Sequence, residues 1–79
     1  MTNIEKYNSI FMEVFSVAEN QLNENFESKQ VDCWDSVRQL SLTTAIEDAF
    51  DIMLDTEDII GFSSYVNGKE ILRKYEIEL

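Results

Sequence analysis

The apolar residues near the start of the chain recur mostly at intervals of three and four, which is the spacing of one face of an α-helix. They are Ile4, Tyr7, Phe11, Val14, Phe15 and Ala18. The chain has no proline, and its two glycines come late, at Gly61 and Gly68. Apolar spacing rather than turn residues therefore divides the sequence. We expect an amphipathic first helix capped by Thr2 or Asn3, with Glu5 three residues after Thr2, as a capping box requires.

The helical spacing is lost between about residues 20 and 35, where Asn, Asp and Ser are frequent. Such side chains compete with helix because they bond to nearby backbone groups. A structureless loop of this length is uncommon and usually has a function. Its four large apolar residues, Leu22, Phe26, Val31 and Trp34, predict that the loop packs across the core.

Helical spacing returns at Ser36, and Asp35 is placed as its N-cap. The predicted buried face of this second helix consists of Val37, Leu40, Thr44, Ile46 and Phe50, widened by Leu42 and Ala45. A short helix follows Asp55 and ends at Gly61. A last helix begins at Ser63 or Ser64. Its apolar residues are Tyr65, Val66, Ile71, Leu72 and Tyr75, and Gly68 inside it predicts the close approach of another backbone.

The sequence therefore predicts one all-α domain over residues 1–79. It is a small four-helix bundle of three main helices and one short helix, with a long loop between the first two. A chain this short buries only about 60% of the surface that its unfolded form exposes. That leaves little room for a deep active-site cleft, which weighs against a self-sufficient enzyme.

The charge balance is strongly acidic, with 16 acidic and 6 basic residues, a net charge of -10 and no histidine. This charge repels nucleic acid and anionic membranes, and it favours protein partners with basic patches. A single cysteine, Cys33, cannot form an internal disulfide, and this fits a reducing compartment. The N-terminal residues do not resemble a signal peptide, and no apolar run is long enough to span a bilayer. We expect a soluble, cytoplasmic monomer.

Metal and nucleophile chemistry are both disfavoured. Asp48, Asp51 and Asp55 are three and four residues apart, which is helical spacing and not the alternation of a calcium-binding loop. A serine or cysteine nucleophile needs an adjacent base, and the chain has no histidine to provide one. We expect no catalytic residue and no metal site. Cys33 is expected to be a partly buried apolar filler, and Trp34 an anchor that fixes the approach to Ser36.

Ser36 has two interpretations. With Asp35 it is a capping pair at a helix start, which is the more frequent meaning of such a pair. The unpaired N–H groups and the positive end of the helix dipole also make this position suitable for a phosphate ester. Local physics permits both interpretations and by itself favours the cap.

Residues 33–72 resemble the acyl carrier proteins of the phosphopantetheine-binding superfamily. That family has Asp-Ser-Leu at the start of its second helix, then a Leu-rich run, an acidic stretch, a short acidic helix and a Ser- or Thr-led last helix. The matching residues here are Asp35-Ser36-Val37, Leu40, Leu42, Ala45 to Phe50, Ile52 and Asp55 to Asp58. Trp34 before the pair resembles a "WDS" subgroup that often serves dedicated pathways. The three-residue signature alone is weak, but the order of elements agrees over the whole chain.

The resemblance implies that the chain is an acyl carrier protein. A separate phosphopantetheinyl transferase, using magnesium and coenzyme A, would attach 4′-phosphopantetheine to Ser36, between Asp35 and Val37. The arm would carry an acyl or related group as a thioester to acyl-loading and acyl-transfer enzymes. In this family, the second helix and the segment after it dock onto basic patches of these enzymes.

The residues that correspond to this docking surface are Arg38, Glu47, Asp48, Asp51, Asp55, Glu57 and Asp58. Arg38 and Ser41 stand where carriers of fatty acid synthesis tend to be acidic. A dedicated pathway with polyketide-like, peptide-like or saccharide cargo therefore agrees with the sequence at least as well as fatty acid synthesis does. The alternative from another class is an unmodified acidic helical module that binds a basic protein surface.

Overall fold

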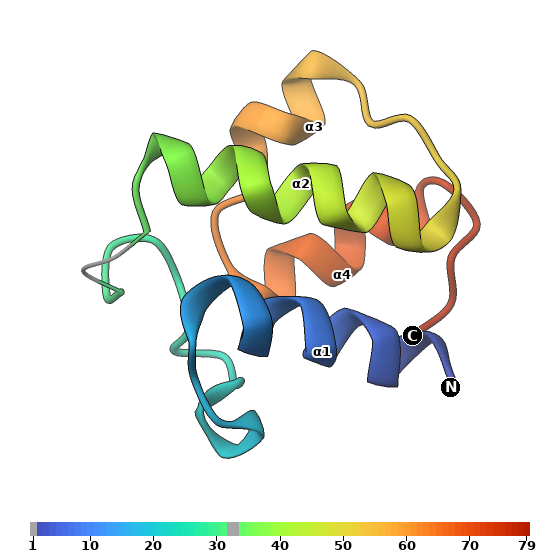
Figure 1. Cartoon of the computed structure of the whole chain (residues 1–79). Coiled ribbons are helices and arrows are strands. Elements are labelled where there is room, and N and C mark those ends of the chain that lie inside the picture. Colours follow the sequence, from blue (N-terminus) through green and yellow to red (C-terminus); the bar gives the residue numbers. More distant parts are fainter. Residues whose placement is uncertain (1, 32–33) are drawn as a thin grey trace.

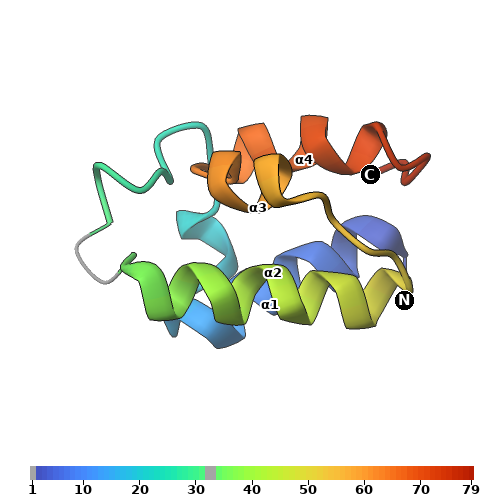
Figure 2. The ribbon, with the colours of Figure 1, turned by 90° about the horizontal axis from the view of Figure 1, so that it is seen from above.

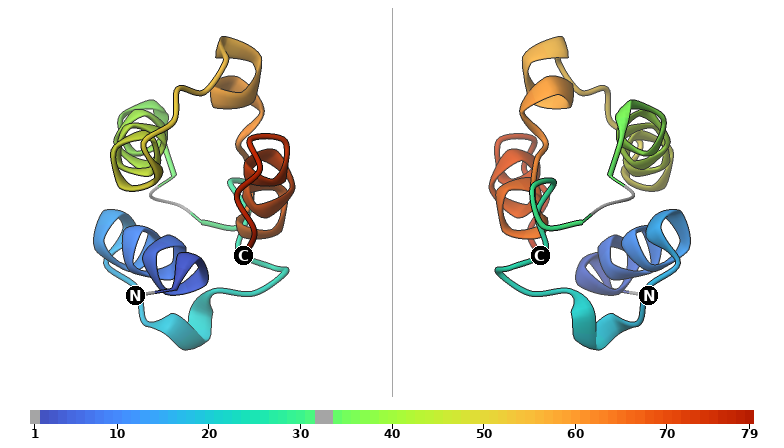
Figure 3. Two further views of the ribbon diagram at one scale, coloured as in Figure 1. Left: turned by 90° about the vertical axis from the view of Figure 1, so that its right-hand side faces the viewer. Right: turned by 90° about the vertical axis from the view of Figure 1, so that its left-hand side faces the viewer.

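The computed structural model describes residues 2–31 and 34–79. Its regular elements are helical, as the sequence predicts: α1 (Asn3–Phe15), the 3₁₀ turn η1 (Glu19–Gln21), α2 (Ser36–Phe50), α3 (Thr56–Gly61) and α4 (Tyr65–Arg73) (Figure 1). The helices α1 and α2 lie side by side and run in opposite directions (Figures 1 and 2). Across the core from them lies α4, and α3 crosses between α2 and α4 (Figure 3). The predicted four-helix bundle is confirmed.

Side-chain caps fix where the three longer helices begin. The Thr2 hydroxyl accepts the N–H of Glu5, and the Glu5 carboxylate accepts the N–H of Thr2 at 3.1 Å, so the predicted capping box is present. The Ser64 hydroxyl accepts the N–H of Asn67 at the start of α4. The first helix is shorter than predicted because Ser16 takes a left-handed conformation with φ of 55°. Ala18 is consequently exposed.

An aromatic cluster fills the centre of the bundle. Phe11 of α1 is fully buried, and six rings lie around it at centroid distances of 4.9–6.1 Å. They belong to Tyr7, Phe15, Phe26, Trp34, Phe62 and Tyr65. Phe26 and Trp34 come from the long loop, which confirms that this segment is packed against the core.

The buried face of α2 differs from the predicted one. Val37 and Leu40 are 69% and 62% exposed, and Thr44 is exposed as well. The side chains that turn inward are Gln39, Leu42, Thr43 and Ile46, which are spaced three and four residues apart. A polar residue holds the first inward position because the carboxamide of Gln39 finds hydrogen-bond partners there. Spacing of apolar residues alone could not predict this.

Gly68 is buried in the middle of α4. A Cβ at this position would overlap the Tyr7 hydroxyl and the Phe62 ring. The close approach predicted at Gly68 is therefore present, but side chains and not another backbone make it. Val66, an apolar residue of the predicted last helix, is 41% exposed.

Candidate functional site

Ser36 is the first residue of α2, and its side chain is exposed. Asp35 is the N-cap, and its Oδ1 accepts the N–H of Arg38 at 2.9 Å. Capping therefore depends on Asp35 and not on Ser36. The Ser36 hydroxyl has no hydrogen-bond partner within residues 2–31 and 34–79, so no hydrogen bond in these ranges gives it a structural role.

A surface hollow of about 300 Å³ lies beside Ser36. Its lining consists of Ser28, Trp34, Asp35, Ser36 and Gln39. This volume is at the lower end of the range of about 300–1,000 Å³ typical of small-molecule sites. A phosphoryl group on the serine would lie at the N-terminus of a helix of four turns, where first-turn N–H groups and the helix dipole favour an anion. The residues present thus fit a phosphodiester at this hydroxyl.

Gln39 connects three segments behind the serine. Its Oε1 accepts the indole N–H of Trp34 at 2.5 Å, and its Nε2 donates to the carbonyl oxygens of Ile59 and Phe62, each at 2.6 Å. The loop before α2 and the end of α3 are thereby joined to the first turns of α2. Sequence reasoning missed Gln39. Its position three, four and seven residues before Leu42, Thr43 and Ile46 is the signal that could have revealed it.

The acidic residues predicted to dock partners divide into two groups. Asp48, Asp51, Asp55 and Glu57 are exposed. Glu47 is half-buried, and its Oε2 accepts the backbone N–H of Leu54 at 2.8 Å. It therefore fastens the turn after α2.

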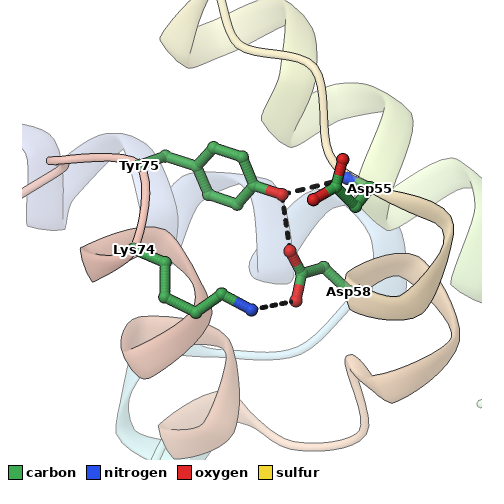
Figure 4. Close-up of polar contacts among 4 residues, drawn as sticks. All are labelled: Asp55, Asp58, Lys74 and Tyr75. Atoms are coloured by element: carbon green, nitrogen blue, oxygen red, sulfur yellow. Dashed lines mark hydrogen bonds and ion pairs between the residues drawn. The ribbon is translucent and has the colours of Figure 1, made fainter.

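Asp58 is a correction to the predicted docking surface. It is 6% exposed, and Lys74 Nζ donates to its Oδ1 at 2.6 Å (Figure 4). The Tyr75 hydroxyl donates to its Oδ2 at 2.5 Å and also accepts the N–H of Asp55 at 2.9 Å. The hydrogen bonds from Lys74 and Tyr75 hold the pKa of Asp58 below its ordinary value, although burial acts in the opposite direction. This carboxylate fastens α3 to the end of α4 and is not free to meet a partner.

The exposed acids of α2 lie far from the serine. Asp48 is twelve positions after Ser36 in the same helix, which corresponds to about 18 Å along the axis. Asp51 is the C-cap residue that follows α2. In the first turns of α2 the exposed side chains of Val37, Leu40 and Arg38 are apolar or basic, and the exposed acid beside Ser36 is the cap residue Asp35.

Large apolar side chains are exposed outside α2 as well. Ile60 of α3 is 75% exposed, and Met53 in the connection between the two helices is 83% exposed. We call Val37, Leu40, Met53 and Ile60 the apolar surface. Sequence reasoning assigned Val37 and Leu40 to the core, and so it did not predict this surface.

No protein-family model, curated protein or solved structure matches the chain. None of the helices in the described ranges has the length and apolar content needed to cross a bilayer. The interpretation of Cys33 as a buried filler concerns a residue outside the described ranges.

Proposed function

We propose that this chain is a carrier protein that receives a 4′-phosphopantetheine arm on Ser36. One observation carries the proposal: the Ser36 hydroxyl is exposed beside a hollow at the start of α2, while Asp35 alone provides the cap. The resemblance of residues 33–72 to acyl carrier proteins supports the same assignment. The chain itself is not an enzyme in this proposal, and a separate transferase performs the chemistry.

In the modification step, the Ser36 oxygen attacks the β-phosphorus of coenzyme A. A new P–O bond forms to the serine, and the bond from that phosphorus to the bridging oxygen breaks. Adenosine 3′,5′-bisphosphate leaves, and the hydroxyl proton passes to a base of the transferase. The arm then offers a thiol that carries an acyl or related group as a thioester.

In this proposal, partner enzymes dock onto exposed residues of the chain itself. Val37, Leu40 and Arg38 lie in the first turns of α2, near the serine, whereas Asp48, Asp51, Asp55 and Glu57 lie further along the chain, in the same segments as Met53 and Ile60. Charges at a distance from the reacting group speed encounter and fix orientation more than they add affinity. A partner with basic groups toward the acids and an acidic group toward Arg38 fits this distribution, which agrees with a dedicated pathway.

The experiment is modification in vitro. The purified chain is incubated with coenzyme A, magnesium and a broad-specificity phosphopantetheinyl transferase, and its intact mass is measured. We expect one phosphopantetheine increment, which is lost in Ser36→Ala and retained in the control Ser41→Ala, an exposed serine of the same helix. An unmodified wild-type chain, in a sample whose serine is free, would refute the proposal.

A second candidate is an unmodified acidic module that binds a basic protein surface. The exposed acids and the apolar surface favour it, since neither depends on Ser36. This candidate predicts that a chain with the substitution Ser36→Ala keeps the biological activity of the wild type.

A further inference from the structure

Two surface hollows near the proposed modification site share one lining residue, and we call the two together the trough. The first is the hollow next to Ser36. The second, of about 220 Å³, is lined by Glu27, Ser28, Lys29, Ser63 and Ser64. Ser28 lines both hollows, so the trough runs from Ser36 across the long loop to the start of α4.

We propose that the phosphopantetheine arm on Ser36 lies in this trough, and that its cargo stays outside the helical core. The inference rests on the proposed function and adds the path of the arm and the kind of cargo. We expect a cargo held at the surface to be polar or short, because every CH₂ of a long aliphatic chain left in water loses the stabilisation that burial would give it.

The floor of the trough is backbone held in a fixed arrangement. Glu27 and Ser64 form an isolated antiparallel bridge. The N–H of Ser28 donates to the carbonyl oxygen of Ser63 at 2.8 Å, and the N–H of Tyr65 donates to that of Phe26 at 2.9 Å. The loop is therefore fastened to α4 along the trough.

The side chains of the trough suit the chemistry of the arm. Pantetheine contains two amides and a hydroxyl, which need hydrogen-bond donors and acceptors spaced along a path. Within the described ranges, the hydroxyls of Ser28 and Ser63 have no hydrogen-bond partner, and Lys29 forms no ion pair. These groups are available to the amide oxygens of the arm, and Glu27 can accept from its N–H groups.

Gln39 closes the route from Ser36 into the core. A chain that entered between α2 and α3 would pass the carboxamide that binds Trp34, Ile59 and Phe62. Displacing it would leave the buried indole N–H of Trp34 without its acceptor, which is unfavourable for a buried donor. Behind it, Phe62, Leu42 and Ile46 are fully buried and already in contact with the cluster.

The test compares amide chemical shifts of the ¹⁵N-labelled chain in its unmodified, phosphopantetheine and decanoyl-phosphopantetheine forms. Attachment of the arm is expected to shift the amides of Ser28, Lys29, Ser63 and Ser64. Addition of the decanoyl chain is expected to leave the core amides, those of Leu42, Ile46 and Leu72, unchanged. Shifts confined to the immediate neighbours of Ser36, or core shifts in the decanoyl form, would overturn the inference.

Two variants sharpen the result. Loss of both hydroxyls in Ser28→Ala/Ser63→Ala is expected to reduce the trough shifts while Ser36 is still fully modified. Replacement of Gln39 by Ala is expected to let the decanoyl chain shift core amides. If that variant does not fold, the wild-type decanoyl form decides the question alone. Intact mass separates the two proposals, because a chain that gains the arm without trough shifts refutes only the path of the arm.

Discussion

Substitution of Asp58 by Ala tests the contacts that hold α3 against the end of α4. The change removes the acceptor of the Tyr75 hydroxyl and the partner of Lys74. Lys74 is 62% exposed and turns to water, so its ion pair contributes little. The bond from Tyr75 to a buried carboxylate contributes about 1.5–3 kcal/mol. We expect a loss of about 2–3 kcal/mol, from a total of about 4–12 kcal/mol for a domain of this size.

The assay is urea unfolding at neutral pH followed by far-ultraviolet circular dichroism. The matched control is Glu57→Ala, which removes an exposed acid one residue away and is expected to change stability by less than about 0.5 kcal/mol. The reasoning is refuted if Asp58→Ala costs no more than Glu57→Ala.

The stability difference between the wild type and Asp58→Ala is also expected to depend on pH. The folded pKa of Asp58 lies below its ordinary value of 3.8, so the group stabilises the fold above the unfolded pKa. This stabilisation is lost as the pH falls through the folded pKa. The difference in unfolding free energy between wild type and Asp58→Ala is therefore expected to be full above about pH 5 and to shrink below about pH 4. A difference that stays constant down to the acid transition would contradict the assigned direction.

Three further substitutions test the caps and the core. Gly68→Ala is expected to destabilise the fold by about 1–3 kcal/mol in urea unfolding, because the added Cβ overlaps Tyr7 and Phe62. This loss outweighs the better helix propensity of alanine, and a gain in stability would contradict the packing. Asp35→Ala is expected to cost about 0.5–2 kcal/mol and Asp35→Asn much less, and equal losses would show that the side chain does not cap. Gln39→Ala is expected to cost about 2–4 kcal/mol because three buried or half-buried partners lose their bonds. A loss below about 1 kcal/mol in the same unfolding experiment would show that water replaces these bonds.

The starts of the helices were predictable because caps are local. Thr2, Asp35 and Ser64 each bond to a backbone N–H three residues away, and a short stretch of sequence contains both partners. The packing of the long loop was also predictable, since Phe26 and Trp34 are too large and apolar to remain in water.

The inward face of α2 and the role of Asp58 were not predictable in the same way. Gln39 is turned inward by carbonyl groups 20 and 23 residues further along the chain, and Asp58 by Lys74, 16 residues away. A polar residue becomes a favourable core residue only when such partners are in place. The spacing of apolar residues therefore assigned Val37 and Leu40 to the core and did not reveal Gln39, and the run of acidic residues placed Asp58 on the docking surface.

The position of Trp34 has an optical consequence. It is the chain's single tryptophan, it is 9% exposed, and its ring packs on Phe15 at 4.8 Å. Its indole N–H donates a hydrogen bond to Gln39. Trp34 is two residues before Ser36 in the sequence, and its side chain lines the hollow beside that serine. Indole emission depends on solvent contact and on the hydrogen bond of its nitrogen. Trp34 can therefore serve as an intrinsic fluorescent reporter of modification at Ser36, without an added label.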